Sequence, residues 1–269
     1  MPPEPTPRQV HDLRTNSRRL EAMLEAIGPD QNGRKVRKQV AKLRKRAGKV
    51  RDMDVLTAYA AELPQTNEED CSVRLLEHLG AVRRAKAKKL SKAAEESTAE
   101  LRRRLKRSSI QLQKRVTRRN ADGSEISSHI SSAALRLLSE LEQPVTLKKS
   151  NLHPYRLKVK ELHNLLRLAK DGSKQEFVES LDEVKDAIGE WHDWVQLRAI
   201  AEKVLQHAPC RLMHELKKRT EERYQRALRL AEGMRRKYLG AANRKPGRKP
   251  RRPRPGESVW SATSALAAA

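Results

Sequence analysis

The sequence predicts an all-α fold of two related helical bundles, and three observations lead to that prediction. The 269 residues are 37% hydrophobic, 35% charged and only 3% aromatic, a composition typical of long amphipathic helices and not of sheets. Apolar residues recur with a period near 3.6 along most of the chain. The pattern of the first half begins again in the second half, which indicates an internal repeat.

The first half is expected to form four helices that are separated by turn residues. Val10, Leu13, Leu20 and Leu24 share one apolar seam of the first helix, and the turn sequence GPDQNG ends it. The third segment contains no proline and a single glycine, so it forms one very long helix or two helices joined head to tail. The four expected helices span residues 7–27, 34–63, 68–120 and 125–142.

The second half is expected to form three helices followed by a basic tail. After Gly240 the sequence NRKPGRKPRRPRPGESVW carries seven basic residues without apolar partners, and its prolines prevent a regular helix. We therefore expect residues 241–269 to form a disordered basic tail. The three expected helices span residues 146–170, 173–206 and 209–239.

The repeat involves polar as well as apolar residues. A shift of 142 residues places VHDLR on LHPYR, and a shift of 141 residues places AGKVRDMDVL on IGEWHDWVQL. Any two amphipathic helices align by their seams, whereas shared His, Arg, Gly and Asp in the same order are harder to obtain by chance. The sequence therefore predicts a first bundle over residues 8–144 and a second over residues 145–240, packed about a pseudo-two-fold axis.

The charge balance indicates a polyanionic partner. Lys and Arg total 59 against 34 Asp and Glu, which gives a formal net charge of +25 and a pI near 10.5. Cys71 and Cys210 belong to no CxxC or Cys/His cluster, so neither a disulfide framework nor structural zinc is expected. No apolar stretch reaches the length of a membrane span, and the N-terminus lacks an apolar leader. We expect a cytoplasmic protein without membrane association.

Two basic stripes border the apolar seams of matching helices, each offset from its seam by one residue, about 100°. Cations at the edge of a core need counter-charge, and nearby carboxylates are few, so an external anion is the simplest explanation. Arginine forks, lysine charges and histidine donors together suit phosphate. The stripes comprise His11, Arg14 and Arg18 in the first half and His153, Arg156, Lys160 and His163 in the second.

Structural roles explain several other features more simply. The charged run over residues 83–119 is expected to be a solvated helix face. Asp52 and Asp193 are expected to accept hydrogen bonds from a stripe cation or from helix backbone, and Trp191 and Trp194 to lie in the core. A histidine at the edge of a core is ordinarily satisfied by a neighbouring helix, but recurrence of the His-x-x-Arg-x-x-x-Arg/Lys pattern favours a functional role for the stripe histidines.

The pairs VHDLRTNSRRL with LHPYRLKVKEL and AGKVRDMDVL with IGEWHDWVQL resemble the CHAD family, the conserved histidine α-helical domain, over roughly residues 8–240. The resemblance implies two pseudo-symmetric four-helix bundles with a basic central groove that binds inorganic polyphosphate. It also implies association with polyphosphate granules and no catalysis. Many relatives carry a triphosphate-tunnel domain with an ExExK strand, and that motif is absent from this sequence.

The resemblance also implies binding positions, residue by residue. Where the family pattern continues after the lysine with an Arg-Tyr pair and a Glu, this chain has LHNL, so His163 departs from the pattern. Arg51, which aligns with His192 in the repeat, is also expected to bind polyphosphate. The expected polyphosphate-binding residues are His11, Arg14, Arg18, Arg19, Arg51, His153, Arg156, Lys158, Lys160 and His163.

Two other functions are open from the residues alone. Non-specific nucleic-acid binding fits the charge and the tail, but few aromatics and no helix-turn-helix spacing weigh against it. A phosphohydrolase would use His11-Asp12 or His192-Asp193 with a divalent metal, but neither dipeptide belongs to a dense ligand cluster and no GxxxxGK[ST] motif occurs. We expect no catalytic residue, metal or cofactor, and the sequence leaves the oligomeric state open.

Overall fold

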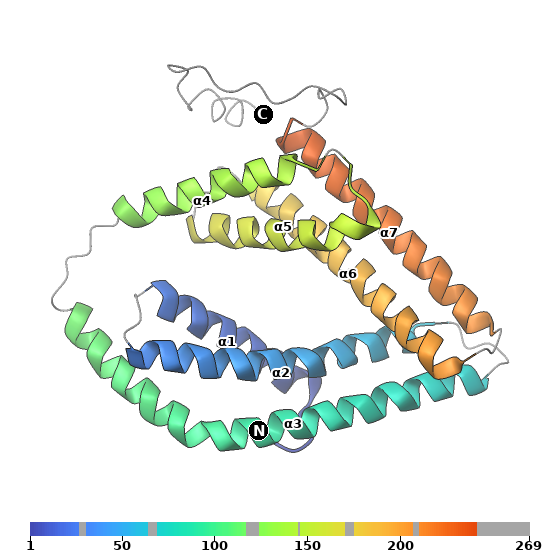
Figure 1. The fold of residues 1–269 in the computed structure, drawn as a ribbon, viewed down its shortest axis with the longest axis horizontal. Helices are drawn as coiled ribbons and strands as arrows, with labels where there is room; N and C mark the ends of the chain where they lie inside the picture. Colours follow the sequence, from blue (N-terminus) through green and yellow to red (C-terminus); the bar gives the residue numbers. More distant parts are fainter. Residues whose placement is uncertain are drawn as a thin grey trace. The chain divides into compact units, whose positions relative to one another are not determined.

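The structure, a computed structural model, describes residues 1–26, 31–63, 69–116, 124–144, 146–169, 175–206 and 210–240. These residues form seven α-helices and no strand, which confirms the predicted all-α class (Figure 1). Each predicted helix is present, with ends that differ by no more than four residues, and the third is one continuous helix of 48 residues. The helices are α1 (Pro7–Ala26), α2 (Gln31–Ala61), α3 (Glu69–Val116), α4 (Ser124–Glu142), α5 (Lys149–Ala169), α6 (Gln175–Leu205) and α7 (Arg211–Tyr238).

The chain divides into two compact units. Unit 1 comprises Met1–Asp122 with Asp193–Thr220, and unit 2 comprises Gly123–His192 with Glu221–Ala269, so α6 and α7 each contribute residues to both. The predicted division into bundles over residues 8–144 and 145–240 was based on the internal sequence repeat, and it stays a prediction. The basic tail predicted over residues 241–269 lies outside the described residues.

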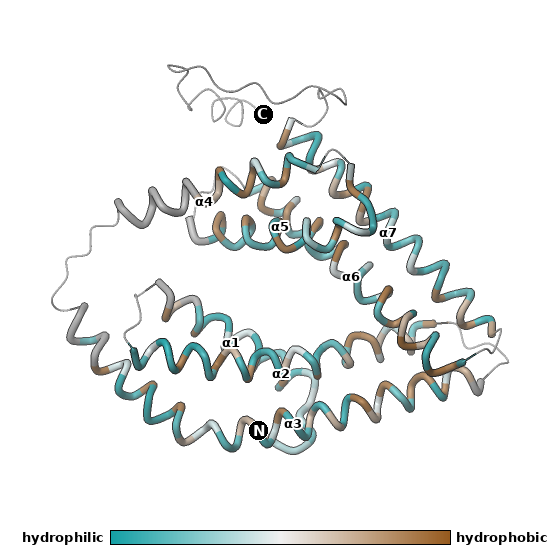
Figure 2. The backbone as a smooth tube through the Cα atoms, in the orientation of Figure 1, coloured by the Kyte–Doolittle hydropathy of each residue, from teal (hydrophilic) through white to brown (hydrophobic). Residues whose placement is uncertain are grey.

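In unit 1, α1 packs on α2 and α2 packs on α3, as their apolar seams predict (Figure 1). Near the start of α1, Val10 is buried with Val50 of α2 and Leu90 of α3. Toward its end, Leu24 is buried against Val36. Hydrophobic and hydrophilic residues accordingly alternate along these helices in Figure 2. The basic stripe of α1 therefore runs beside a packed interface.

A further cluster of unit 1 joins α2, α3, the C-terminal part of α6 and the beginning of α7. Trp194 is 2% exposed and stacks on Tyr59 of α2, with ring centroids 4.9 Å apart, so its predicted core role is confirmed. Cys71 and Cys210 are free thiols, both buried in this cluster.

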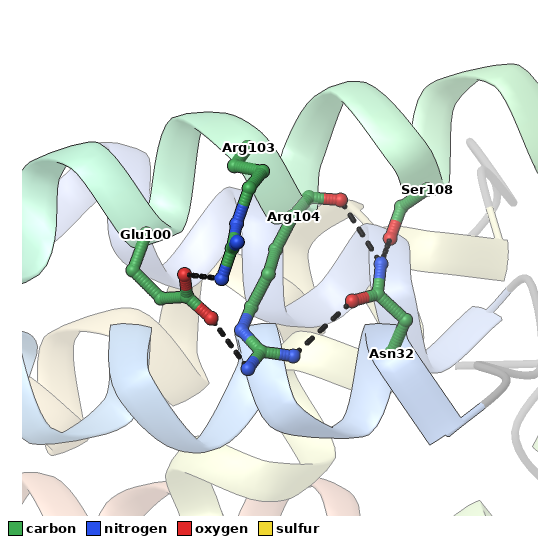
Figure 3. Close-up of polar contacts among 5 residues, drawn as sticks. All are labelled: Asn32, Glu100, Arg103, Arg104 and Ser108. Atoms are coloured by element: carbon green, nitrogen blue, oxygen red, sulfur yellow. Dashed lines mark hydrogen bonds and ion pairs between the residues drawn. The ribbon is translucent and has the colours of Figure 1, made fainter.

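A polar contact fixes the beginning of α2 against α3 (Figure 3). Nδ2 of Asn32 donates to the carbonyl of Arg104 at 3.0 Å and to Oγ of Ser108 at 2.8 Å. Nη1 of Arg104 donates in return to Oδ1 of Asn32 at 3.3 Å, while Glu100 forms ion pairs with Arg103 and Arg104. Because Ser108 is buried, its hydroxyl needs a hydrogen-bond partner, and Asn32 supplies one.

In unit 2, α4 packs on α5, and the N-terminal part of α6 and the end of α7 complete the core. Trp191 is buried, which confirms its predicted core role. Its ring centroid lies 5.6 Å from that of Tyr224 in α7. Arg235 of α7 is also buried and donates to the carbonyls of Glu142 and Pro144. Within the described ranges, no helix has both the length and the hydrophobicity that crossing a membrane requires.

Candidate functional site

The first basic stripe lies on the surface of unit 1 along α1. Arg14 is half-buried, whereas His11, Arg18 and Arg19 are exposed. Nε2 of His11 lies 3.4 Å from Oγ1 of Thr15, one turn further along the same helix. Arg14 is therefore the most enclosed of these four basic residues.

Arg14 lies within a cluster of arginine side chains from α1 and α2. Burial lowers its pKa most, and the charges of Arg18, Arg51 and Arg44 lower it further. The opposing charge comes from Asp52, whose Oδ1 lies 3.9 Å from Nη1 of Arg14, too far for a hydrogen bond. Arg14 therefore lies in a concentration of positive charge, and the opposing carboxylate of Asp52 is 3.9 Å away.

The carboxylates around Arg14 are poor counter-ions. Glu21 is engaged by Arg44, whose Nε lies 3.0 and 2.9 Å from its two oxygens. Burial raises the pKa of Asp52, the charge of Arg14 opposes that rise, and the charge of Asp193 adds to it. The structure places Asp52 in an ion pair with Arg14, but at 3.9 Å it accepts no hydrogen bond from this arginine, so its predicted role as a hydrogen-bond acceptor stays a prediction.

A lysine from α3 adds to this group. Burial lowers the pKa of Lys86, the charge of Lys49 lowers it further, and Asp52 raises it. Sequence reasoning missed Lys86 and Arg44 because neither belongs to the repeated motif. Most other cations of the run over residues 83–119 that the structure describes are exposed, as predicted, although Arg83 pairs with Asp54 at 2.6 Å.

The second stripe lies in unit 2, on the side of α5 that meets α6. The ring centroids of His153 and His192 lie 4.6 Å apart, and the angle between the ring planes is 30°. Burial lowers the pKa of His153, and the charges of His192 and Arg156 lower it further. Among the described residues, no hydrogen-bond partner reaches Nδ1 of His153, which is buried. His192 was not predicted as a site residue, although it aligns in the repeat with Arg51, which was predicted to bind.

Arg156 is held directly on the backbone of α6. Its Nε donates to the carbonyl of Lys185 at 3.0 Å, and its guanidinium group lies against Gly189. Lys160, one turn further along α5, is half-buried. The structure therefore brings His153 and Arg156 of the predicted set together on the surface that α5 and α6 share within unit 2.

Lys158 and His163 contact carboxylates of neighbouring helices. Nζ of Lys158 lies 3.1 Å from Oε2 of Glu140 in α4. His163 is buried, and its Nε2 lies 3.3 Å from Oδ1 of Asp182 in α6. Burial lowers the pKa of His163, and Asp182 opposes that change. These contacts hold α5 to α4 and to α6, and the predicted binding role of both residues stays a prediction.

Acidification is expected to destabilise unit 2. Because His153 and His163 have pKa values below the ordinary value near 6.5, the unfolded chain binds more protons there, and stability is lost as pH falls below about 6.5. Urea unfolding at pH 7.5 and 5.5 measures this loss, which His153→Gln should reduce. His78→Gln, at an exposed position of α3, should leave it unchanged. A pH-independent free energy of unfolding would contradict the expectation.

Comparison with known proteins places these helices in a family. The model of the CHAD domain family matches residues 4–202, a segment that includes both basic stripes. No curated protein and no solved structure matches the chain. In the part of the chain that the structure describes, no group of three or more His, Cys, Asp and Glu residues could hold a metal ion.

Proposed function

The chain belongs to the CHAD domain family, and on that premise we propose that it binds inorganic polyphosphate through the basic stripes of α1 and α5. CHAD domains are associated in general with polyphosphate-related proteins. The two four-helix bundles and the basic groove that the resemblance implies stay predictions. Binding is therefore proposed for the stripe of each unit by itself.

The cluster of arginine side chains around Arg14 is the observation that carries this proposal. Burial and neighbouring positive charges both disfavour the charged form of Arg14, and Asp52 compensates only in part. A bound phosphate would supply the missing negative charge and accept paired hydrogen bonds from the guanidinium forks. Polyphosphate carries about one negative charge per phosphate and no bases, so it fits a site with dense cations and few aromatic residues.

Comparative binding tests the proposal against nucleic-acid binding. Long-chain polyphosphate, double-stranded DNA and RNA are titrated at equal charge concentration and at several salt concentrations. We expect polyphosphate to bind most tightly at physiological salt, with an affinity that falls steeply as salt rises. Tighter binding of DNA under the same conditions would favour the alternative, a non-specific nucleic-acid-binding protein.

We propose that binding occurs without turnover and directs the protein to polyphosphate granules in the cytoplasm. Incubation with polyphosphate and Mg²⁺ or Mn²⁺ should then release no orthophosphate. Sustained release with turnover would instead support a phosphohydrolase. A stripe variant that cannot bind the polymer should also lose its localisation to granules.

A further inference from the structure

Gly189 of α6 is buried beneath a charged side chain. A Cβ atom added at this position would lie 2.6 Å from Nη2 of Arg156, and 3.1 Å from both its Cζ and its Nε. Because the first distance is shorter than Cβ contacts in real proteins, the guanidinium group can occupy this place only over a glycine. The glycine therefore defines where Arg156 lies on α6.

A backbone hydrogen bond fixes the same guanidinium group. Nε of Arg156 donates to the carbonyl oxygen of Lys185, four residues before Gly189 on α6. A helical carbonyl keeps a second lone pair beside its helical bond, so it can accept this donor without breaking the helix. Arg156 is thus held at two points of one helical turn.

The internal repeat supplies a matched glycine without this contact. Gly48 of α2 aligns with Gly189, yet a Cβ atom at Gly48 would meet nothing within 4 Å. Both glycines lie inside 31-residue helices, where alanine is intrinsically the better helix former. The two positions therefore differ in their contact with a stripe arginine and share the same local conformation.

We infer that Gly189 is a positioning residue for anion binding, because it lets α6 hold the guanidinium group of Arg156 ready for a phosphate. This inference rests on the proposed polyphosphate-binding function. A pre-positioned arginine loses less side-chain entropy when it binds, and its planar fork keeps a defined direction. Gly189 acts through Arg156 and need not touch the ligand.

The test compares Gly189→Ala with Gly48→Ala by calorimetric titration with long-chain polyphosphate. Gly189→Ala should weaken binding roughly three- to tenfold, and Gly48→Ala should change it by less than about twofold. In an Arg156→Ala background, Gly189→Ala should cause no further loss, because the residue that it positions is gone. Equal affinities of the two single variants, or a full additional loss in the double variant, would overturn the inference.

Arg156→Lys provides a second test that leaves α6 intact. Lysine keeps the charge but has no Nε–H to donate to the carbonyl of Lys185, so binding should weaken at least as much as in Gly189→Ala. Wild-type affinity in Arg156→Lys would overturn the inference even if Gly189→Ala folds poorly. Absence of binding by the wild-type protein would instead refute the proposed function, so the two failures are distinguishable.

Discussion

Replacement of Arg14, Arg18, Arg156 and Lys160 by glutamate is expected to abolish polyphosphate binding, with a loss of at least about a hundredfold in affinity. The four replacements lower the formal net charge from +25 by eight units, so the protein stays strongly basic. Because overall attraction to a polyanion is largely kept, a loss of this size is expected only if the stripes bind the polymer. Calorimetric titration measures the affinity, and circular dichroism should show unchanged helicity.

A control variant with the same change in net charge separates the stripes from the rest of the surface. Exposed cations of α3 serve this purpose because they lie on its solvated face. The control should lose no more than a few-fold in affinity, and a loss equal to that of the stripe variant would indicate unspecific attraction. A comparable loss on deletion of residues 241–269 alone would move the site to the tail. The four control replacements are Lys88→Glu, Lys89→Glu, Arg102→Glu and Lys106→Glu.

Trp194→Ala is expected to have the largest effect on stability, a loss of about 3–5 kcal/mol in the free energy of unfolding. The indole is 2% exposed, stacks on Tyr59 and belongs to the cluster that joins four helices of unit 1. Its Nε1 has no hydrogen-bond partner among the described residues, so the loss comes from packing. Urea unfolding measures the change, with Val73→Ala at an exposed position of α3 as the control. A loss below about 1 kcal/mol would show that this cluster is not an essential core.

The helices could be predicted because local signals determine them. An apolar seam of period 3.6 decides where a helix packs, and turn residues decide where it ends. The sequence left open whether α3 is one helix or two, because the segment contains no proline but includes one glycine, Gly80, which has a low helix propensity. In the structure α3 continues through Gly80, because packing on α2 on both sides of this residue outweighs the low helix propensity of glycine.

The site could be predicted only where it follows from position on one helix. The stripe beside the seam predicted partly enclosed cations, which the structure shows for Arg14 but not for His11 and Arg18, because both of these are exposed. The contributions of Arg44 and Lys86 depend on how three helices pack, and no motif spacing contains that information. The repeat also concealed a difference, because Gly48 and Gly189 align in sequence but only Gly189 lies against an arginine.

A structure of the protein with a short polyphosphate would show whether the stripe arginines bind phosphate groups. We expect phosphate oxygens within hydrogen-bonding distance, about 2.7–3.2 Å, of the guanidinium groups of Arg14 and Arg156. Arg156 should keep its place over Gly189 in that complex. Phosphates bound only away from both arginines would show that the two stripes are not the binding site.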